Sequence, residues 1–206
     1  MNTGRLFYAV LALMCTLGVR PMGGATEAAQ PSPIQSVVLH RLFREFYSSS
    51  EHFEGEESAL GDALGTDCLV QRIVTAPSGK GAIVRAFQGD GSRNEDWYGW
   101  NAEVLAPFDA VIDRVHINPK TNLPGEFGSA PASSVVFLRH DGLRVMLAHV
   151  QNVRVKVGDR VKAGQVVAQV GNNGLGSCPH IHVGAWKDDR SFQIRWDLRS
   201  GKTRHP

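Results

Sequence analysis

Short runs of β-prone residues alternate with turn residues along the chain from Cys68 onward. Gly, Pro, Asn and Asp separate these runs, which is typical of an all-β domain. The expected strands are Ala82–Phe87, Val104–Val115, Ser134–Arg139, Leu143–Val150, Val153–Val157 and Val166–Val170. Asp141-Gly142, between two of them, predicts a two-residue hairpin. We therefore expect a mainly β fold with an antiparallel sheet.

The hydrophobic positions before Cys68 have a different spacing, which predicts a short amphipathic helix over Ile34–Tyr47. The apolar residues that recur there at helical intervals are Ile34, Val37, Val38, Leu42 and Phe46. Ser48–Gly65 is polar, acidic and contains glycine, which indicates a loop or a weak helix.

The first residues have the pattern of a cleaved secretory signal. A short segment ending at Arg5 carries one positive charge, Leu6–Val19 is almost wholly apolar, and small residues follow up to Ala29. The apolar run is short for a bilayer span, although a retained N-terminal anchor is the alternative. We expect a signal peptide at 1–28, an N-terminal helical or linker segment at 29–75, the main domain at 76–198 and a tail at 199–206.

Composition sets the broad class. The 206 residues are 42% hydrophobic and 20% charged, which suits one globular domain, and the net charge is +2. No basic stripe is present, so nucleic acid is not expected as a partner. Export would leave Cys68 and Cys178, and an oxidising compartment favours a Cys68–Cys178 disulfide. A free thiol, or Cys178 as a metal ligand, stays open.

Two histidines lie two residues apart in Pro179-His180-Ile181-His182, in a run that reads as a strand. Side chains at this spacing share a face, roughly 6.5–7 Å apart along the strand. One imidazole can therefore bind a metal while the other reaches a water or substrate there. A strand with two ordinary surface histidines is the alternative. His149, on the predicted strand after Asp141-Gly142, shares a face with Leu147.

About half of the chain, roughly Gly89 to Trp186, resembles the lysostaphin-type (LytM-like) zinc endopeptidases, which cut peptide cross-links in bacterial cell walls. The matching segments are Val104–Ile112, Leu147-Ala148-His149, the glycine-containing hairpin Val157–Gln165 with Val170-Gly171-Asn172, and Pro179-His180-Ile181-His182-Val183. The resemblance implies a duplicated-hybrid-motif β fold, in which a curved sheet forms part of a barrel-sandwich.

The resemblance also implies roles for single residues. His182 matches the family's metal-binding His, and His149 and His180 match its two catalytic histidines that do not bind metal. Asp96 is the best match to its metal-binding Asp. The family has a His four residues before that Asp, where this chain has Ser92.

Another side chain would have to replace the missing histidine, and Asn94 is the best placed oxygen donor. The alternatives are Asp90, Glu95, His116 and Cys178. Zinc accepts oxygen ligands, so the expected metal set is Asp96, Asn94 and His182.

These features predict an exported zinc metalloendopeptidase, secreted or periplasmic, that hydrolyses peptide bonds in peptidoglycan without stable membrane insertion after signal cleavage. A degenerate homologue that binds or regulates wall hydrolysis without a metal is the alternative. A phosphotransferase-type or lipoyl-type carrier is a third interpretation. The leader opposes the first kind of carrier, and Lys156 and Lys162 are not placed for the second.

Overall fold

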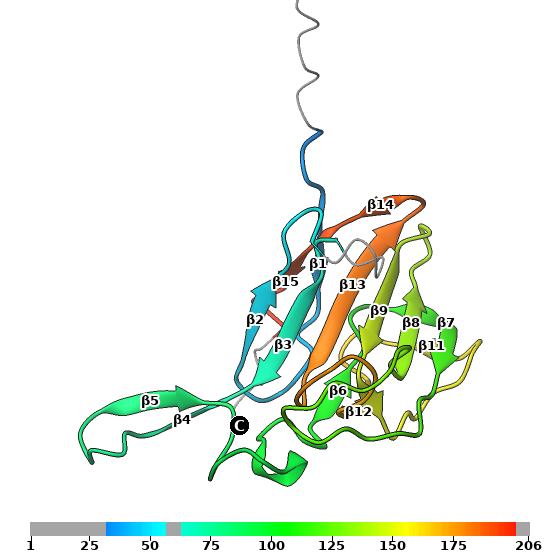
Figure 1. Ribbon diagram of the computed structural model, residues 1–206. Helices are drawn as coiled ribbons and strands as arrows, with labels where there is room; N and C mark the ends of the chain where they lie inside the picture. The colour runs from blue at the N-terminus through cyan, green and yellow to red at the C-terminus, as the bar shows by residue number, and fades with distance from the viewer. Residues whose placement is uncertain (1–31, 57–62, 201–206) are drawn as a thin grey trace, which may run out of the picture. The chain divides into compact units, whose positions relative to one another are not determined.

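The computed structural model describes residues 32–56 and 63–200 (Figure 1). Residues 34–206 form one compact unit, and the predicted signal peptide lies outside the described residues. The strands are β1 Ser36–Leu39, β2 Tyr47–Glu51, β3 Thr66–Val70, β4 Arg72–Thr75, β5 Ala82–Arg85, β6 Glu103–Leu105, β7 Ala110–His116, β8 Ser134–Leu138, β9 Arg144–Ala148, β10 Val150–Gln151, β11 Arg160–Val161, β12 Val166–Val170, β13 Ile181–Lys187, β14 Arg190–Ser191 and β15 Gln193–Trp196.

The main sheet has eight strands in the order β11-β7-β8-β9-β13-β3-β2, with β14 paired to β13. Its neighbouring strands are all antiparallel, so the prediction of a mainly β, antiparallel fold is confirmed. The predicted hairpin at Asp141-Gly142 joins β8 to β9, and Gly142 has a φ of 90°, which a residue with a side chain rarely adopts.

A three-stranded sheet, β10-β12-β6, contributes to the same hydrophobic core as the main sheet. Phe137 of β8 and Leu147 of β9 are completely buried, as are Val104 of β6 and Val167 of β12. Burying one such side chain stabilises the fold by roughly 1.5–3 kcal/mol. This core fixes the position of β9 and β13, which flank the site described below.

The prediction of a helix over Ile34–Tyr47 is wrong. β1 lies in that range and pairs in parallel with β15 near the end of the chain. Val37 and Leu39 of β1 are buried while Val38 between them is 58% exposed, which is the period of a strand. A short run of apolar residues fits the period of a helix as well as that of a strand, and here pairing with the distant β15 selects the strand.

The segment expected to be a polar loop, Ser48–Gly65, contains most of β2. β2 pairs with β3, and β3 pairs with β13, so both strands extend the main sheet beyond β13. The N-terminal part of the chain therefore supplies one side of the sheet on which the histidines lie.

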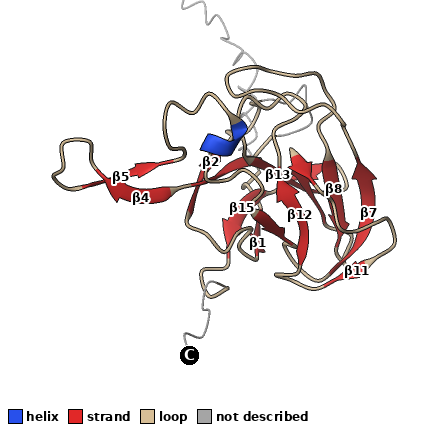
Figure 2. Cartoon of the chain, turned by 90° about the horizontal axis from the view of Figure 1, so that it is seen from below, coloured by secondary structure: helices blue, strands red, loops and turns tan. Residues whose placement is uncertain are grey.

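β4 and β5 form a separate two-stranded hairpin that projects from the main sheet (Figure 2). It follows directly after β3, with Gln71 between the two strands. Within the described part of the chain there is no helix long and apolar enough to cross a membrane.

Candidate metal centre and the histidines beside it

Three neighbouring strands bring His52, Asp67 and His182 together. Asp67 of β3 and His182 of β13 are direct partners across the antiparallel ladder, so their side chains share one face of the sheet. His52 follows β2, and its N–H donates to the Gly65 carbonyl at 2.9 Å, which continues the β2–β3 ladder by one residue. The ring of His52 stacks against that of His182, with 5.3 Å between their centroids.

The donor atoms of these three side chains suit a metal ion. His182 Nδ1 lies 2.8 Å from Asp67 Oδ1, and His52 Nε2 lies 3.6 Å from Asp67 Oδ2. One ligand atom from each residue lies within 4.8 Å of the other two. Ligands at about 2.0–2.2 Å around a tetrahedral zinc are roughly 3.3–3.6 Å apart. The 3.6 Å between His52 Nε2 and Asp67 Oδ2 matches this spacing, whereas the 2.8 Å between His182 Nδ1 and Asp67 Oδ1 is that of a hydrogen bond. Two imidazoles and one carboxylate this close together could hold a zinc ion and leave one position open, with the metal taking the place of that hydrogen bond.

The electrostatics of Asp67 agree with this arrangement. Burial alone would raise the pKa of the Asp67 carboxyl. The hydrogen bond with His182 and the electrostatic attraction to the imidazoles of His180, His182 and His52 outweigh burial and lower the pKa to about 2. The carboxylate is therefore ionised at neutral pH, the form in which it can bind a cation.

His149 and His180 lie next to this cluster. Their ring centroids are 4.4 Å apart, and the ring of His149 is 6.3 Å from that of His182. His180 Nε2 lies 3.7 Å from Asp67 Oδ1. The structure thus brings together the three histidines that the sequence singled out, from the end of β9 and the start of β13.

Carbonyl groups fix which nitrogen of each ring carries the proton. His149 Nδ1 is 2.7 Å from the Asn173 carbonyl oxygen, and His180 Nδ1 is 2.8 Å from that of Cys178. A carbonyl only accepts, so each Nδ1–H donates, and in the neutral ring Nε2 is left as a proton acceptor. Burial lowers the pKa of both rings, that of His149 to about 3, so both are neutral at pH 7.

The loop after β12 leaves little space beside these rings. His149 has a φ of 61°, a left-handed conformation that costs energy for a residue with a side chain. A Cβ atom at Gly176 would lie 3.0 Å from His149 Nδ1 and 3.2 Å from His180 Cε1. Glycine at this position therefore lets the loop approach both imidazoles closely.

Four buried asparagines hold this loop in place, and they are Asn94, Asn122, Asn172 and Asn173. Asn172 Nδ2 donates to Asn94 Oδ1 at 2.9 Å, and Asn94 Nδ2 donates to the Asn122 carbonyl at 2.8 Å. Asn122 Nδ2 in turn donates to the carbonyls of Gly174 and Gly176. The network therefore fixes the segment whose Asn173 carbonyl orients His149.

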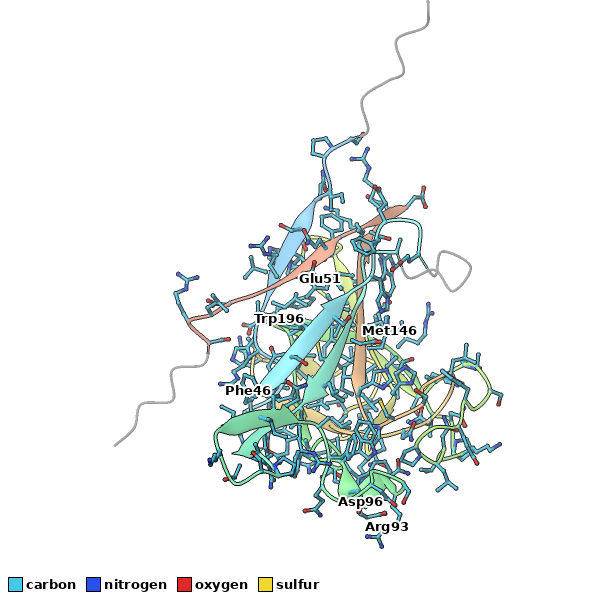
Figure 3. All side chains as sticks on the ribbon, turned by 60° about the vertical axis from the view of Figure 1, so that its left-hand side comes forward. Phe46, Glu51, Arg93, Asp96, Met146 and Trp196 are labelled. Atoms are coloured by element: carbon cyan, nitrogen blue, oxygen red, sulfur yellow. The ribbon has the colours of Figure 1, made fainter. Side chains whose placement is uncertain are left out.

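Asp96 and Asn94, the other expected metal ligands, have partners of their own in the structure, and the group of His52, Asp67 and His182 does not include Asp96. Asp96 Oδ1 accepts from the Arg93 guanidinium at 3.1 Å, and Asp96 Oδ2 accepts from the Arg93 N–H. Figure 3 shows Arg93 and Asp96 side by side. The amide of Asn94 is occupied by the asparagine network.

Sequence reasoning missed His52 and Asp67. His52 directly follows β2 and Asp67 lies on β3, and the sequence pattern predicts neither strand. β2 is polar, and the alternation of buried and less buried positions in Thr66–Val70 is visible in the structure but not as an apolar–polar pattern in the sequence. His52 directly after β2 and Asp67 on β3 have side chains on the same face of the sheet. A prediction that β2 and β3 pair would therefore have brought both residues to the site.

The expected Cys68–Cys178 disulfide is wrong, because both cysteines are free thiols. Cys68 points into the core from β3, on the face opposite Asp67, and is completely buried. Cys178 Sγ lies 4.0 Å from His180 Nδ1, beside the histidines. The two side chains therefore lie on opposite sides of the sheet.

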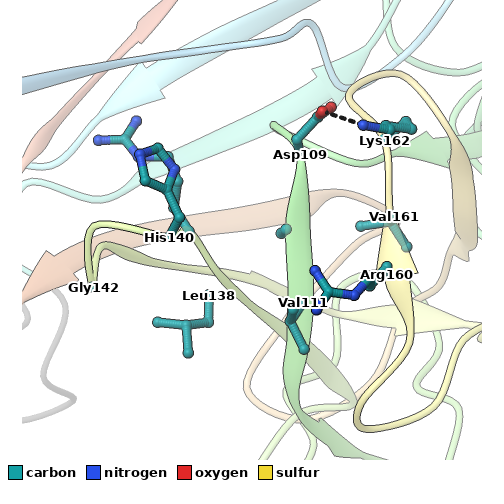
Figure 4. A pocket seen from close by; sticks show the side chains of 10 residues that line it. Asp109, Val111, Leu138, His140, Gly142, Arg160, Val161 and Lys162 are labelled. Carbon is teal, nitrogen blue, oxygen red and sulfur yellow. Dashed lines mark hydrogen bonds and ion pairs between the residues drawn. The ribbon is translucent and has the colours of Figure 1, made fainter.

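A pocket lies away from the candidate metal centre, between β7, β11 and the β8–β9 turn (Figure 4). Its lining includes Asp109, His140, Arg160 and Lys162, and Lys162 pairs with Asp109 at 2.7 Å. None of the clustered histidines lines it, so it is separate from the candidate metal centre.

Comparison with known sequences gives two matches, and both are to peptidases. The model of peptidase family M23 matches residues 98–194. The chain is 39% identical over 51 residues to the glycyl-glycine endopeptidase ALE-1 of Staphylococcus capitis. That stretch is 24% of this chain and 14% of the length of the endopeptidase.

Solved structures with a similar arrangement include two bacterial catalytic domains. The catalytic domain of lysostaphin from Staphylococcus simulans is 20% identical with a TM-score of 0.41, and the alignment covers 68% of this chain and 80% of that one. The catalytic domain of a variant of the prophage-encoded M23 protein EnpA from Enterococcus faecalis is also 20% identical, with a TM-score of 0.42. That alignment covers 68% and 81% of the two chains.

Proposed function

Because residues 98–194 belong to peptidase family M23, we propose that this protein is a zinc metalloendopeptidase that hydrolyses peptide bonds in peptidoglycan. The observation that carries the proposal is the cluster of His52, Asp67 and His182 beside His149 and His180. Two imidazoles and a carboxylate form the ligand set of several hydrolytic zinc sites, in which the remaining position is left for water or substrate.

His52, Asp67 and His182 are the proposed zinc ligands. Asp67 and His182 face each other on β3 and β13, and His52 directly follows β2, so the sheet holds the three side chains close together. A zinc ion at this position supplies Lewis acidity toward a peptide carbonyl and toward water. Asp67 is ionised at neutral pH, as a ligand must be.

His149 and His180 are the proposed catalytic residues. Each presents Nε2 as a proton acceptor, because its Nδ1–H is committed to a backbone carbonyl. One imidazole can therefore take the proton of the attacking water, and the resulting imidazolium can return a proton to the departing amine. The other, once protonated or bound to a water, can donate to the oxygen on which negative charge develops.

Peptidoglycan is proposed as substrate on the similarity to the glycyl-glycine endopeptidase of Staphylococcus capitis. A wall substrate implies export, and the apolar segment Leu6–Val19 supports a secreted or periplasmic location. The alternative of a degenerate homologue rested on the missing histidine before Asp96. His52 supplies an imidazole to the cluster, so that reason no longer favours a protein without a metal.

The function is tested by measuring zinc in the purified protein together with the release of peptides from purified peptidoglycan. Hydrolysis that stops with a chelator and returns with added zinc supports the proposal. Zinc-loaded protein that releases no new amino groups from peptidoglycan would refute the proposed activity while leaving the metal site intact.

A further inference from the structure

The β4–β5 hairpin presents two unpaired strand edges. β4 and β5 pair with each other, and no other strand of the described ranges 32–56 and 63–200 joins either of them. The hairpin projects from the main sheet in both ribbon views (Figures 1 and 2). An isolated two-stranded hairpin is marginally stable in water, and an open edge is a template for a further strand.

The two faces of the hairpin differ in chemistry. Strand alternation and the pairing register place two cationic and two apolar side chains on one face, namely Arg72, Arg85, Val74 and Ile83. The opposite face carries the apolar and small side chains of Ile73, Val84, Thr75 and Ala82. Ile73 is 69% exposed and Val84 is 51% exposed, so this apolar surface is open to a ligand.

The charge of the hairpin is of one sign. Residues 71–86 contain Arg72, Lys80 and Arg85 and have no Asp or Glu. Arg72 stacks over the ring of Tyr98 with 4.4 Å to its centroid, which anchors the base of the hairpin. Stacking leaves the in-plane N–H groups of a guanidinium able to meet a carboxylate. A second copy of the hairpin would oppose like charges, whereas an acidic strand complements them.

We propose that the hairpin binds, by strand addition, an extended peptide segment of a partner protein in which acidic and apolar residues alternate. The added backbone would pair with an open edge of β4 or β5. Because strand side chains alternate with period two, the acidic residues would then share the face of Arg72 and Arg85. The apolar residues would lie with Ile73 and Val84. This role is separate from the proposed hydrolysis and does not depend on the metal.

The ligand specificity is tested with labelled octapeptides and the intact protein, by fluorescence anisotropy. A peptide of alternating Val and Glu is expected to bind saturably, and the same peptide with Lys in place of Glu at least about tenfold more weakly. The amides of alternate residues in a strand point to opposite edges, so only the Val amides or only the Glu amides can pair with the hairpin. N-methylation of the set that pairs is expected to remove binding, and N-methylation of the other set is not. No binding of the Val-Glu peptide, equal binding of the Lys peptide, or full binding of both N-methylated peptides overturns the proposal.

The place of binding is tested with variants of exposed hairpin residues and matched controls. Ile73→Thr, which keeps a β-branched side chain, and Arg72→Gln are each expected to weaken binding of the Val-Glu peptide by about tenfold or more. Ile117→Thr and Arg114→Gln change exposed residues outside the hairpin and are expected to bind like the wild type. Hairpin variants that bind the peptide like the wild type contradict the proposal.

The same variants separate this inference from the proposed enzyme. Zinc content and peptidoglycan hydrolysis are expected to stay at wild-type values in both hairpin variants. If they instead keep peptide binding but lose binding to insoluble peptidoglycan, the hairpin serves the wall polymer and the partner-protein proposal is wrong.

Discussion

His182 of β13 lies directly opposite Asp67 of β3, and His182 Nδ1 meets Asp67 Oδ1 at 2.8 Å. This pair connects the part of the chain matched by the M23 family, residues 98–194, to strands that precede it. The candidate metal centre therefore depends on β2 and β3 as much as on the strand with the two histidines.

Replacing His149 or His180 by Ala is expected to leave zinc bound and to remove activity. Neither imidazole belongs to the proposed ligand set, and loss of a proton-transfer group costs roughly 10²–10⁴-fold in rate. Zinc content by elemental analysis and kcat on peptidoglycan measure the two effects. Loss of zinc in either variant would instead make that histidine a ligand.

Replacing Asn94 by Ala is expected to lower kcat while zinc stays bound. The variant removes the Asn94 hydrogen bonds to Asn172 Nδ2 and to the Asn122 carbonyl and leaves these two groups only their longer 3.4 Å contact with each other. The free energy of unfolding should therefore fall by about 1–3 kcal/mol. The loop that carries the Asn173 carbonyl would then hold His149 less firmly. Urea unfolding and kinetics measure both changes.

Asn152→Ala is the control for Asn94, because its side chain bonds Gln169 at an exposed position. It should change neither zinc content nor kcat. If Asn94→Ala loses zinc while remaining folded, Asn94 is a metal ligand after all.

The stability of the fold is expected to decrease as pH rises from about 10 to about 12. Burial and, to a smaller extent, the nearby Cys68 together raise the pKa of Tyr47 from 10.0 to about 12. The unfolded tyrosine therefore ionises at lower pH than the folded one, so stability present below pH 10 is lost as pH rises. Tyr47→Phe should flatten this loss in urea unfolding measured between pH 9 and pH 12. An unchanged slope would show that Tyr47 is not the responsible group.

Cys68 and Cys178 are expected to react with an alkylating agent without prior reduction. Cys68 should not react while the protein is folded, because it is completely buried and burial raises the pKa of its thiol. It should react once the protein is unfolded. In denaturant both should be modified at once, as measured by mass spectrometry. Protein whose two thiols need a reductant first would contain the disulfide that the structure lacks.

Much of the fold follows from local patterns, whereas the metal ligands depend on pairing over long distances. The β-prone run Val166–Val170 and the Asp141-Gly142 turn identify a strand and a hairpin from neighbouring residues alone. β1 was taken for a helix because its partner β15 is distant in the chain, and only that pairing selects the strand.

The histidines of the site are identifiable from the sequence because they lie on or next to strands with clear patterns. His149, His180 and His182 fall at the ends or starts of β9 and β13, and the structure brings all three together. Asp96 is the expected ligand only through the resemblance to the family's metal-binding Asp, and in the structure its carboxylate pairs with Arg93. The candidate carboxylate, Asp67, lies on β3, a strand that the sequence pattern does not predict.

The most direct test measures zinc bound to matched variants of the two competing aspartates and of His52. We expect His52→Ala and Asp67→Asn to lose zinc while remaining folded by circular dichroism. Asp96→Asn, which changes the Arg93 partner, should retain about one zinc ion per chain, as the wild type does. Zinc that stays bound in Asp67→Asn and His52→Ala but is lost in Asp96→Asn would contradict the proposed metal centre.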